Sequence, residues 1–153
     1  MKIFNNIKTI IPNNLIIGIA RFFSEKIQSY CLLSDILQHD LIEDGLITER
    51  CSGWLDKDSN DIIYENDVVK RGNVLYVVKF DPFSHHFYLG TNIRFNKKSN
   101  KYDSYVITEI KEEVNKGYST NSYLTESSAA KMKKICSARF FNQESLDLAR
   151  SLR

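Results

Sequence analysis

The sequence predicts an α+β fold, in which a small antiparallel β-barrel or curled sheet of SH3-like size is flanked by N-terminal and C-terminal helices. Short runs rich in β-branched and aromatic residues, separated by polar turns, fill the middle of the chain. Apolar residues recur at helical spacing on both sides of this middle. The 153 residues, 42% of them hydrophobic and 26% charged, are typical of one globular domain. We therefore expect a single domain with three parts.

The first part of the chain, residues 1–48, is expected to be helical. Pro12 and the asparagines that follow it suit the start of a helix. Gly18 weakens this prediction, and residues 15–20 fit a buried strand as well. The apolar side chains that recur at helical spacing are Leu15, Ile16, Ile19, Phe22, Phe23, Ile27 and Tyr30.

A second helix is expected within the same part of the chain. Ser34 can cap its N-terminus, and Gly45 stands where a left-handed residue commonly ends a helix. The apolar stripe of this helix consists of Leu33, Ile36, Leu37, Leu41 and Ile42.

The middle part, residues 49–110, is predicted to form the β core. Its apolar runs are short and rich in valine, isoleucine, tyrosine and phenylalanine, and polar or glycine-containing turns separate them. The expected strands are residues 61–70, 74–80, 87–89, 92–96 and 102–110. The expected turns are Arg-Gly-Asn at 71–73, Asp-Pro at 81–82 and Lys-Lys-Ser-Asn at 97–100. Strands at this spacing are typical of a small antiparallel barrel or a curled sheet.

The last part, residues 120–153, is predicted to be helical again. A helix beginning at Ser127 or Ser128 would place lysines on one side and Ala129, Met132, Ile135 and Cys136 on the other. Asn142 can cap a final short helix whose apolar residues are Leu146, Ala149 and Leu152.

Two segments of the middle part resemble a known family. From Ser52 the chain reads Ser-Gly-Trp-Leu-Asp-Lys-Asp-Ser-Asn-Asp-Ile-Ile-Tyr-Glu-Asn-Asp-Val-Val-Lys, and from Leu75 it reads Leu-Tyr-Val-Val-Lys-Phe-Asp, followed by Phe-Tyr-Leu. In order and spacing this resembles the YopX family of phages and prophages, whose members carry TG-x-x-DKNGKEIYEGDIV and then YVVEWD…GFYL. Asp61 and Asn66 depart from that pattern, and the family's closing GNIYENPEL segment is missing. Over residues 52–90 the resemblance implies a phage origin and the β core, and it implies no chemistry.

The charges are strongly segregated along the chain, although the net charge is only +2. Residues 31–67 carry ten acidic and two basic residues. Residues 68–111 carry eight basic and three acidic residues, and residues 128–153 carry six basic and two acidic residues. Such a pattern indicates either two oppositely charged surfaces with a charged partner or an acidic segment that folds against the basic ones.

Two candidate binding surfaces follow from the charges. The first is an acidic face that would bind a basic groove of a host protein or ribonucleoprotein, formed by Asp35, Asp40, Glu43, Asp44 and Glu49. The leading hypothesis is thus a cytoplasmic, non-enzymatic accessory protein that inhibits a host defence, in the manner of an anti-CRISPR protein, or a nucleic-acid-processing system.

The alternative hypothesis is a nucleic-acid-binding module. It would combine a lysine-rich hairpin, two stacking tyrosines and a basic C-terminal helix. Its candidate residues are Lys97, Lys98, Lys101, Tyr102, Tyr105, Lys131, Lys133, Lys134 and Arg139.

Other constellations predict little chemistry. Asp56, Asp58 and Asn60 echo a calcium-binding loop, but Asp61 replaces the glycine that such a loop requires. His85 and His86 are adjacent, so in a strand they would point to opposite faces and would not share a metal ion. The three cysteines have no metal-ligand spacing. We therefore expect no cofactor, no metal, no catalytic residue and no membrane span, and the oligomeric state is left open.

Overall fold

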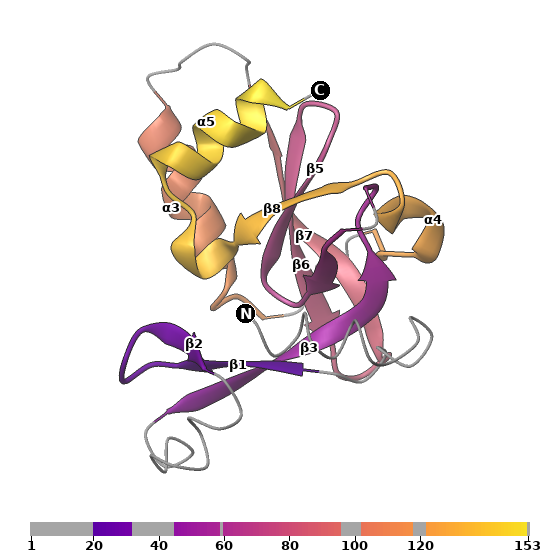
Figure 1. Ribbon diagram of the computed structural model, residues 1–153, viewed down its shortest axis with the longest axis vertical. Coiled ribbons are helices and arrows are strands. Elements are labelled where there is room, and N and C mark those ends of the chain that lie inside the picture. The colour runs from indigo at the N-terminus through magenta and orange to yellow at the C-terminus, as the bar shows by residue number, and fades with distance from the viewer. Residues whose placement is uncertain (1–19, 32–44, 59, 96–101, 118–121, 153) are drawn as a thin grey trace. The chain divides into compact units, whose positions relative to one another are not determined.

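The structure is a computed structural model, in which residues 20–31, 45–58, 60–95, 102–117 and 122–152 are described. The chain divides into two compact units, and the boundary follows Gly53. Antiparallel strands and helices make the fold α+β, as the sequence predicts (Figure 1). None of the helices in the described ranges is long and apolar enough to cross a membrane.

The first unit contains a β-hairpin rather than the helix that we expected around Phe22 to Tyr30. Strand β1 (Ala20–Ser24) pairs antiparallel with β2 (Ser29–Cys31) and, on its other side, with β3 (Leu46–Leu55). Gln28, at a φ of +53°, lies in the turn between β1 and β2. The helical spacing was misleading because cross-strand partners, rather than the next helical turn, cover the aromatic side chains.

The second predicted helix, residues 33–44, lies outside the described residues. Gly45 directly precedes β3 and has the left-handed backbone expected of it, with a φ of +82°.

The second unit is built on a curled antiparallel sheet in the order β7-β6-β5-β8. Its strands are β5 (Asp67–Arg71), β6 (Val74–Asp81), β7 (His86–Arg94) and β8 (Lys133–Ser137). The short strand β4 (Ile62–Tyr64) precedes them. The register shifts between β5 and β8 and between β6 and β7, and such bulges increase the bend of a sheet.

The turn predicted at residues 71–73 is confirmed, and a further turn at Asn66 divides the expected strand 61–70 into β4 and β5. Asn66, between β4 and β5, has a φ of +68°, and Gly72, between β5 and β6, has a φ of +60°. A glycine or an asparagine adopts such a backbone at the smallest cost, which is why these residues indicate turns.

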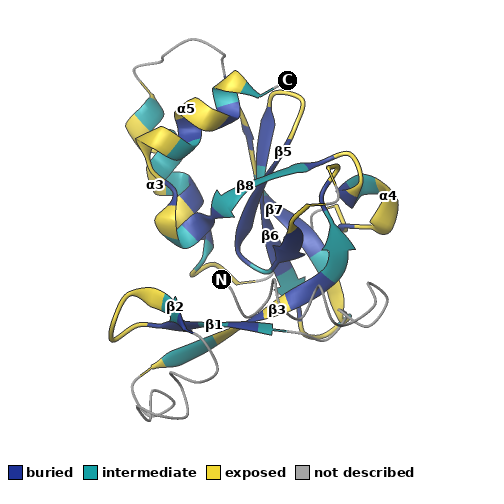
Figure 2. Ribbon diagram, in the orientation of Figure 1, coloured by how far each residue is buried: buried dark blue, intermediate teal, exposed yellow. Residues whose placement is uncertain are grey.

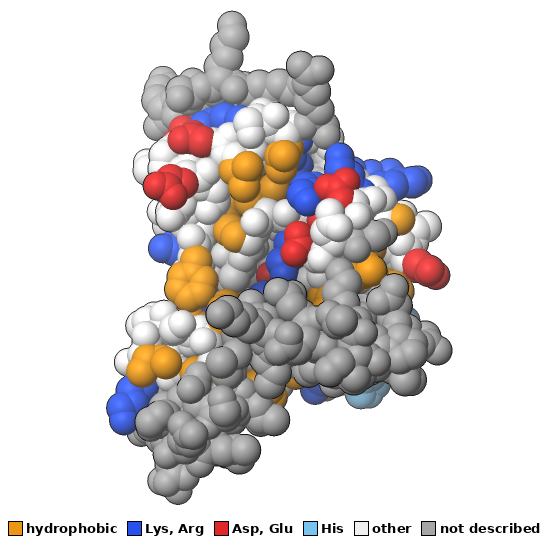
Figure 3. Space-filling view, in the orientation of Figure 1, with side chains coloured by type: hydrophobic (Ala, Val, Ile, Leu, Met, Phe, Trp, Pro, Cys, Tyr) orange, Lys and Arg blue, Asp and Glu red, His pale blue; other side chains and the backbone are white. Residues whose placement is uncertain are grey.

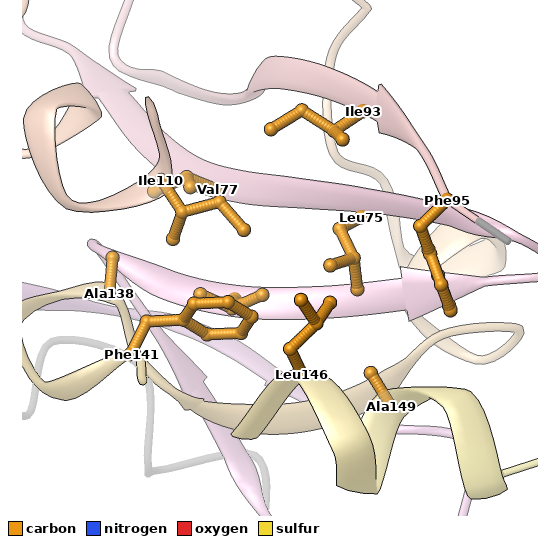
Figure 4. Close-up of a cluster of buried hydrophobic side chains, with 10 residues drawn as sticks. Leu75, Val77, Ile93, Phe95, Ile110, Ala138, Phe141, Leu146 and Ala149 are labelled. Carbon is orange, nitrogen blue, oxygen red and sulfur yellow. The ribbon is translucent and has the colours of Figure 1, made fainter. Parts of the chain in front are cut away.

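On the central strands β5 and β6, residues that point to either face of the sheet are buried, as the dark blue of these strands in Figure 2 shows. One face packs against α3 (Asp103–Glu113), the 3₁₀ turn η3 (Ala138–Phe140) and α5 (Gln143–Ser151). Figure 4 shows the resulting core, made of Val68, Leu75, Val77, Ile93, Phe95, Ile110, Ala138, Phe141, Leu146 and Ala149. The other face carries a second cluster, made of Ile63, Val69, Val78, Leu89, Leu124, Ala129 and Met132.

The strands expected at residues 87–89 and 92–96 form one strand, β7. Two further segments of the second unit differ from the prediction in the type of secondary structure. Residues 102–110, expected as a strand, form most of α3, because Val106, Ile107 and Ile110 all reach the core from one helical face. The helix expected from Ser127 to Cys136 is only one turn, α4 (Glu126–Ala129), which Thr125 caps. The chain then enters β8, whose backbone pairs with β5. The final helix α5 and its cap Asn142 are confirmed.

A short segment beside the sheet covers the free edge of β7. Tyr123 forms an isolated antiparallel bridge with Tyr88. The Leu89 N–H donates to the Ser122 carbonyl at 2.8 Å, and the Leu124 N–H donates to the Phe87 carbonyl at 2.9 Å. Residues 122–124 therefore extend the sheet by one short strand.

Candidate functional site

The acidic candidate face is described at one position only. Asp35, Asp40, Glu43 and Asp44 lie outside the described residues. Glu49, on β3, is fully buried: its carboxylate accepts from Arg21 at 2.8 Å and from the Tyr30 hydroxyl at 2.6 Å. The Arg21 guanidinium also lies 4.5 Å from the centre of the Tyr30 ring. Glu49 therefore stabilises the first unit and is not exposed to a partner.

Two lysines of the basic candidate surface are held inside the second unit. The Lys133 ammonium lies 2.9 Å from a carboxylate oxygen of Asp58 and 3.4 Å from one of Asp56. The hydrogen bond with Asp58 raises the pKa of Lys133 above 10.5, and the same bond lowers the pKa of Asp58 below 3.8. Lys133 thus occupies the place between two aspartates where the sequence pattern would have placed calcium.

Lys134, the next residue of β8, is also held by a carboxylate. Its ammonium lies 3.1 Å from a carboxylate oxygen of Asp67, donates to the Ile62 carbonyl at 2.9 Å and lies 5.2 Å from the Tyr64 ring centre. Asp67 is fully buried and also accepts from the Tyr64 N–H at 2.8 Å. Asp56, which is also buried, accepts from the Lys134 N–H at 3.2 Å.

Part of the charge segregation therefore reflects folding. Acids at 56, 58 and 67 come from the acidic segment, and the lysines that bind them come from the basic C-terminal segment. Arg150 also forms a two-pronged ion pair, with Asp103 of the segment 68–111, and the hydrogen bond between them raises the pKa of Arg150. Figure 3 shows blue and red side chains in direct contact on the side of the second unit where β8 begins. We refer to Asp56, Asp58, Asp67, Lys133 and Lys134 as the β8 charge cluster.

The remaining basic and aromatic candidates are dispersed. Lys97, Lys98 and Lys101 lie outside the described residues. Tyr102 and Tyr105 are exposed at the start of α3, with 57% and 66% of their surface accessible, instead of on a hairpin. Lys131 is exposed after α4, and Arg139 lies in η3.

The β6–β7 turn carries an exposed aromatic residue that the sequence analysis missed. Phe83 is 89% exposed, the highest fraction among the exposed large hydrophobic side chains of the described residues. The residue stands between Asp81-Pro82 and Ser84, where a turn is expected whether or not the aromatic ring is exposed. The sequence therefore indicated the turn but not the exposure of Phe83.

Hydrogen bonds that Asp81 accepts hold this turn in place. The Asp81 carboxylate accepts from the Phe83 N–H at 3.0 Å and from the Ser84 hydroxyl at 2.6 Å. The Asp81 carbonyl accepts from the His85 N–H at 2.9 Å. The Ser84 hydroxyl, helped by the Phe83 N–H, lowers the pKa of Asp81. Phe83 therefore extends from an ordered loop.

The two histidines lie at the same end of the hairpin. His85, with a φ of +58°, packs edge-on against Phe80, with ring centres 6.2 Å apart. The exposed His86 stacks on Tyr123, with ring centres 4.9 Å apart and an interplanar angle of 26°. Tyr123 is 46% exposed. Phe83, His85, His86 and Tyr123 together form what we call the aromatic tip.

The aromatic tip contains no strong cation. Neither residues 80–93 nor residues 117–130, the two segments that supply it, contain a lysine or an arginine. Among the described residues, no group of three or more histidine, cysteine, aspartate or glutamate side chains is placed to hold a metal ion. The geometry of the tip suits contact between rings and apolar surface.

No protein-family model matches this sequence, and no curated protein matches it significantly.

Proposed function

We propose that this chain is a phage-derived, non-enzymatic accessory protein that acts in the bacterial cytoplasm by binding a host protein. In this proposal it inhibits a host defence or a nucleic-acid-processing system, and its target is a host protein that is either free or part of a ribonucleoprotein. The resemblance of residues 52–90 to the YopX family supports the phage origin. The observation that carries the proposal is the aromatic tip, where the fold exposes aromatic rings in place of cations.

Interface energetics explain why this observation favours a protein partner. Aromatic residues are enriched at the centres of protein–protein interfaces, whereas charged residues are depleted there. A nucleic-acid surface instead needs several lysines or arginines to neutralise phosphates. Lys133 and Lys134, two candidates for that task, already bind Asp56, Asp58 and Asp67. The described charges therefore favour protein recognition.

A second candidate function is nucleic-acid binding near the start of α3. Tyr102 and Tyr105 are exposed there, and exposed tyrosine rings can stack on bases. They directly follow the lysine-rich residues 97–101 in the sequence. In this alternative, a phosphate backbone would bind the lysines while bases stack on the tyrosines.

One pair of experiments separates these functions. Tagged protein is used to isolate partners from a host lysate, and each captured protein is then purified and tested for direct binding. In parallel, gel shifts with single-stranded and double-stranded DNA and RNA are run over a salt series. The proposal expects a direct protein complex and no steeply salt-dependent shift. A nucleic-acid complex whose affinity falls steeply with salt, without any direct protein complex, would support the alternative instead.

A further inference from the structure

We propose that Phe83 is the anchor by which the aromatic tip docks into an apolar pocket on a protein partner, with the stacked rings of His86 and Tyr123 at the edge of the contact. This inference rests on the proposed function and specifies its site. Three observations support it: the exposure of Phe83, the hydrogen-bonded β6–β7 turn, and the lack of lysine and arginine in the two segments that form the tip.

Exposure of Phe83 has no benefit inside the fold. The side chain is 89% exposed, whereas Phe87, also on this hairpin, is partly buried and packs edge-on against Phe80 at 5.0 Å. Burial of a phenylalanine removes a large apolar area from water, and the chain does not make use of this gain at position 83. A partner pocket that encloses the ring would recover it.

The turn presents Phe83 in a defined position before binding. The Asp81 carboxylate holds the backbone N–H of Phe83 and the hydroxyl of Ser84, and Pro82 has a fixed φ. Ordering a loop on binding normally opposes association, so a loop that is already ordered binds more tightly. These features are those of a preorganised interface anchor.

The local charge favours a protein over other partners. Residues 80–93 and 117–130 contain no lysine or arginine, and Asp81 and Glu126 are acidic. These two segments therefore offer no lysine or arginine to a nucleic acid or to an anionic lipid surface. An apolar pocket on a protein requires none.

The first step of the test is photocrosslinking in the bacterial host. A benzoyl-phenylalanine at position 83 is compared with one at position 105, because Tyr105 is also an exposed aromatic residue but lies on α3, outside the aromatic tip. The protein crosslinked from position 83 is identified, purified and titrated by calorimetry against the wild-type chain, Phe83→Ser and Tyr105→Ser.

We expect a crosslink from position 83, an affinity of Phe83→Ser that is about 10- to 100-fold weaker than wild type, and a change of less than about twofold for Tyr105→Ser. A melting curve of each variant controls for folding. If a purified partner binds wild type and Phe83→Ser equally, the anchor is wrong while the proposed function stands. If the wild-type chain binds no host protein, both are wrong. A crosslinked product containing two copies of this chain, or an oligonucleotide complex lost in Phe83→Ser, would also overturn the inference.

Discussion

The β8 charge cluster and the aromatic tip use their side chains in opposite ways. In the cluster, four of the five charged residues are partly or fully buried and bind charges of the opposite sign, as Lys134 does with Asp67; only Asp58 is exposed. In the tip, an aromatic residue that would normally be buried is in solvent at Phe83. Charge at the first site therefore supports the fold, and apolar surface at the second site is left for a partner. Residue type alone would have suggested the reverse assignment.

The largest expected effect is on the charge cluster. Asp67→Ala removes a buried carboxylate that binds the Lys134 ammonium at 3.1 Å and the Tyr64 N–H at 2.8 Å. Loss of one partner from a buried pair leaves the other uncompensated, so we expect a loss of about 3–5 kcal/mol in the free energy of unfolding. Urea denaturation measures this loss.

The matched control is Asp147→Ala. Its carboxylate is 59% exposed and lies 3.6 Å from Arg150. Exposed pairs contribute little, so the loss should stay below about 1 kcal/mol. Equal losses in the free energy of unfolding for the two variants would show that the buried pair of Asp67 contributes no more stability than the exposed pair of Asp147.

Strand β7 begins at the exposed His86 and continues into the core, where Gly90 lies against two side chains. A Cβ added at Gly90 would lie 2.1 Å from Glu113 Oε1 and 3.0 Å from Lys79 Cγ. Both neighbours are buried, so we expect Gly90→Ala to lower the free energy of unfolding by about 1–3 kcal/mol. Gly117→Ala is the control, because nothing lies within 4 Å of its added Cβ. A neutral Gly90→Ala in thermal denaturation would mean that Glu113 moves away freely.

The charge cluster should also make stability depend on pH. The pKa of Asp58 is lower in the folded chain, so its pair with Lys133 contributes stability above about pH 4, and this is lost as the pH falls through the folded pKa. The raised pKa of Lys133 implies a second loss as the pH rises above about 10.5. We expect Asp58→Asn to reduce the stability difference between pH 7 and pH 3, measured by urea denaturation. An unchanged difference would contradict this role.

The smallest expected effect on stability is at the aromatic tip. Phe83→Ser should change the free energy of unfolding by less than about 0.5 kcal/mol, because the ring is 89% exposed. The same substitution is expected to weaken partner binding, so stability and binding separate at this position. A marked fall in the melting temperature would show that Phe83 packs within the chain and would argue against the anchor.

The β core was predictable because its signals are local. Strands β5 and β6 read directly from runs of β-branched residues, and the turns at Asn66 and Gly72 read from residues that tolerate a positive φ. Helix α5 was predictable for the same reason, since its cap Asn142 and its apolar spacing lie within one short segment.

The elements whose type differs from the prediction, α3 and β8, depend on contacts with distant parts of the chain. The segment of Val106, Ile107 and Ile110 contains β-formers, and the core face it meets decides that it is helical. Ile135 and Cys136 fit a helix in isolation but pair as β8 with β5. Of the candidate sites, the sequence showed the charges but not their pairing, and it showed the turn at Pro82 but not the exposure of Phe83. Pairing and exposure are properties of the folded chain.

The short segment 122–124 has a consequence for solubility. Without it, the apolar run Phe87-Tyr88-Leu89 of β7 would present open backbone groups, and such an edge is a template for intermolecular sheet growth and fibril formation. The backbone hydrogen bonds of Leu89 and Leu124 occupy that edge. A proline in place of Leu124 would remove one of them and is expected to make the protein prone to aggregate. Residues 122–124 thus act as a gatekeeper that keeps the sheet from joining those of neighbouring molecules.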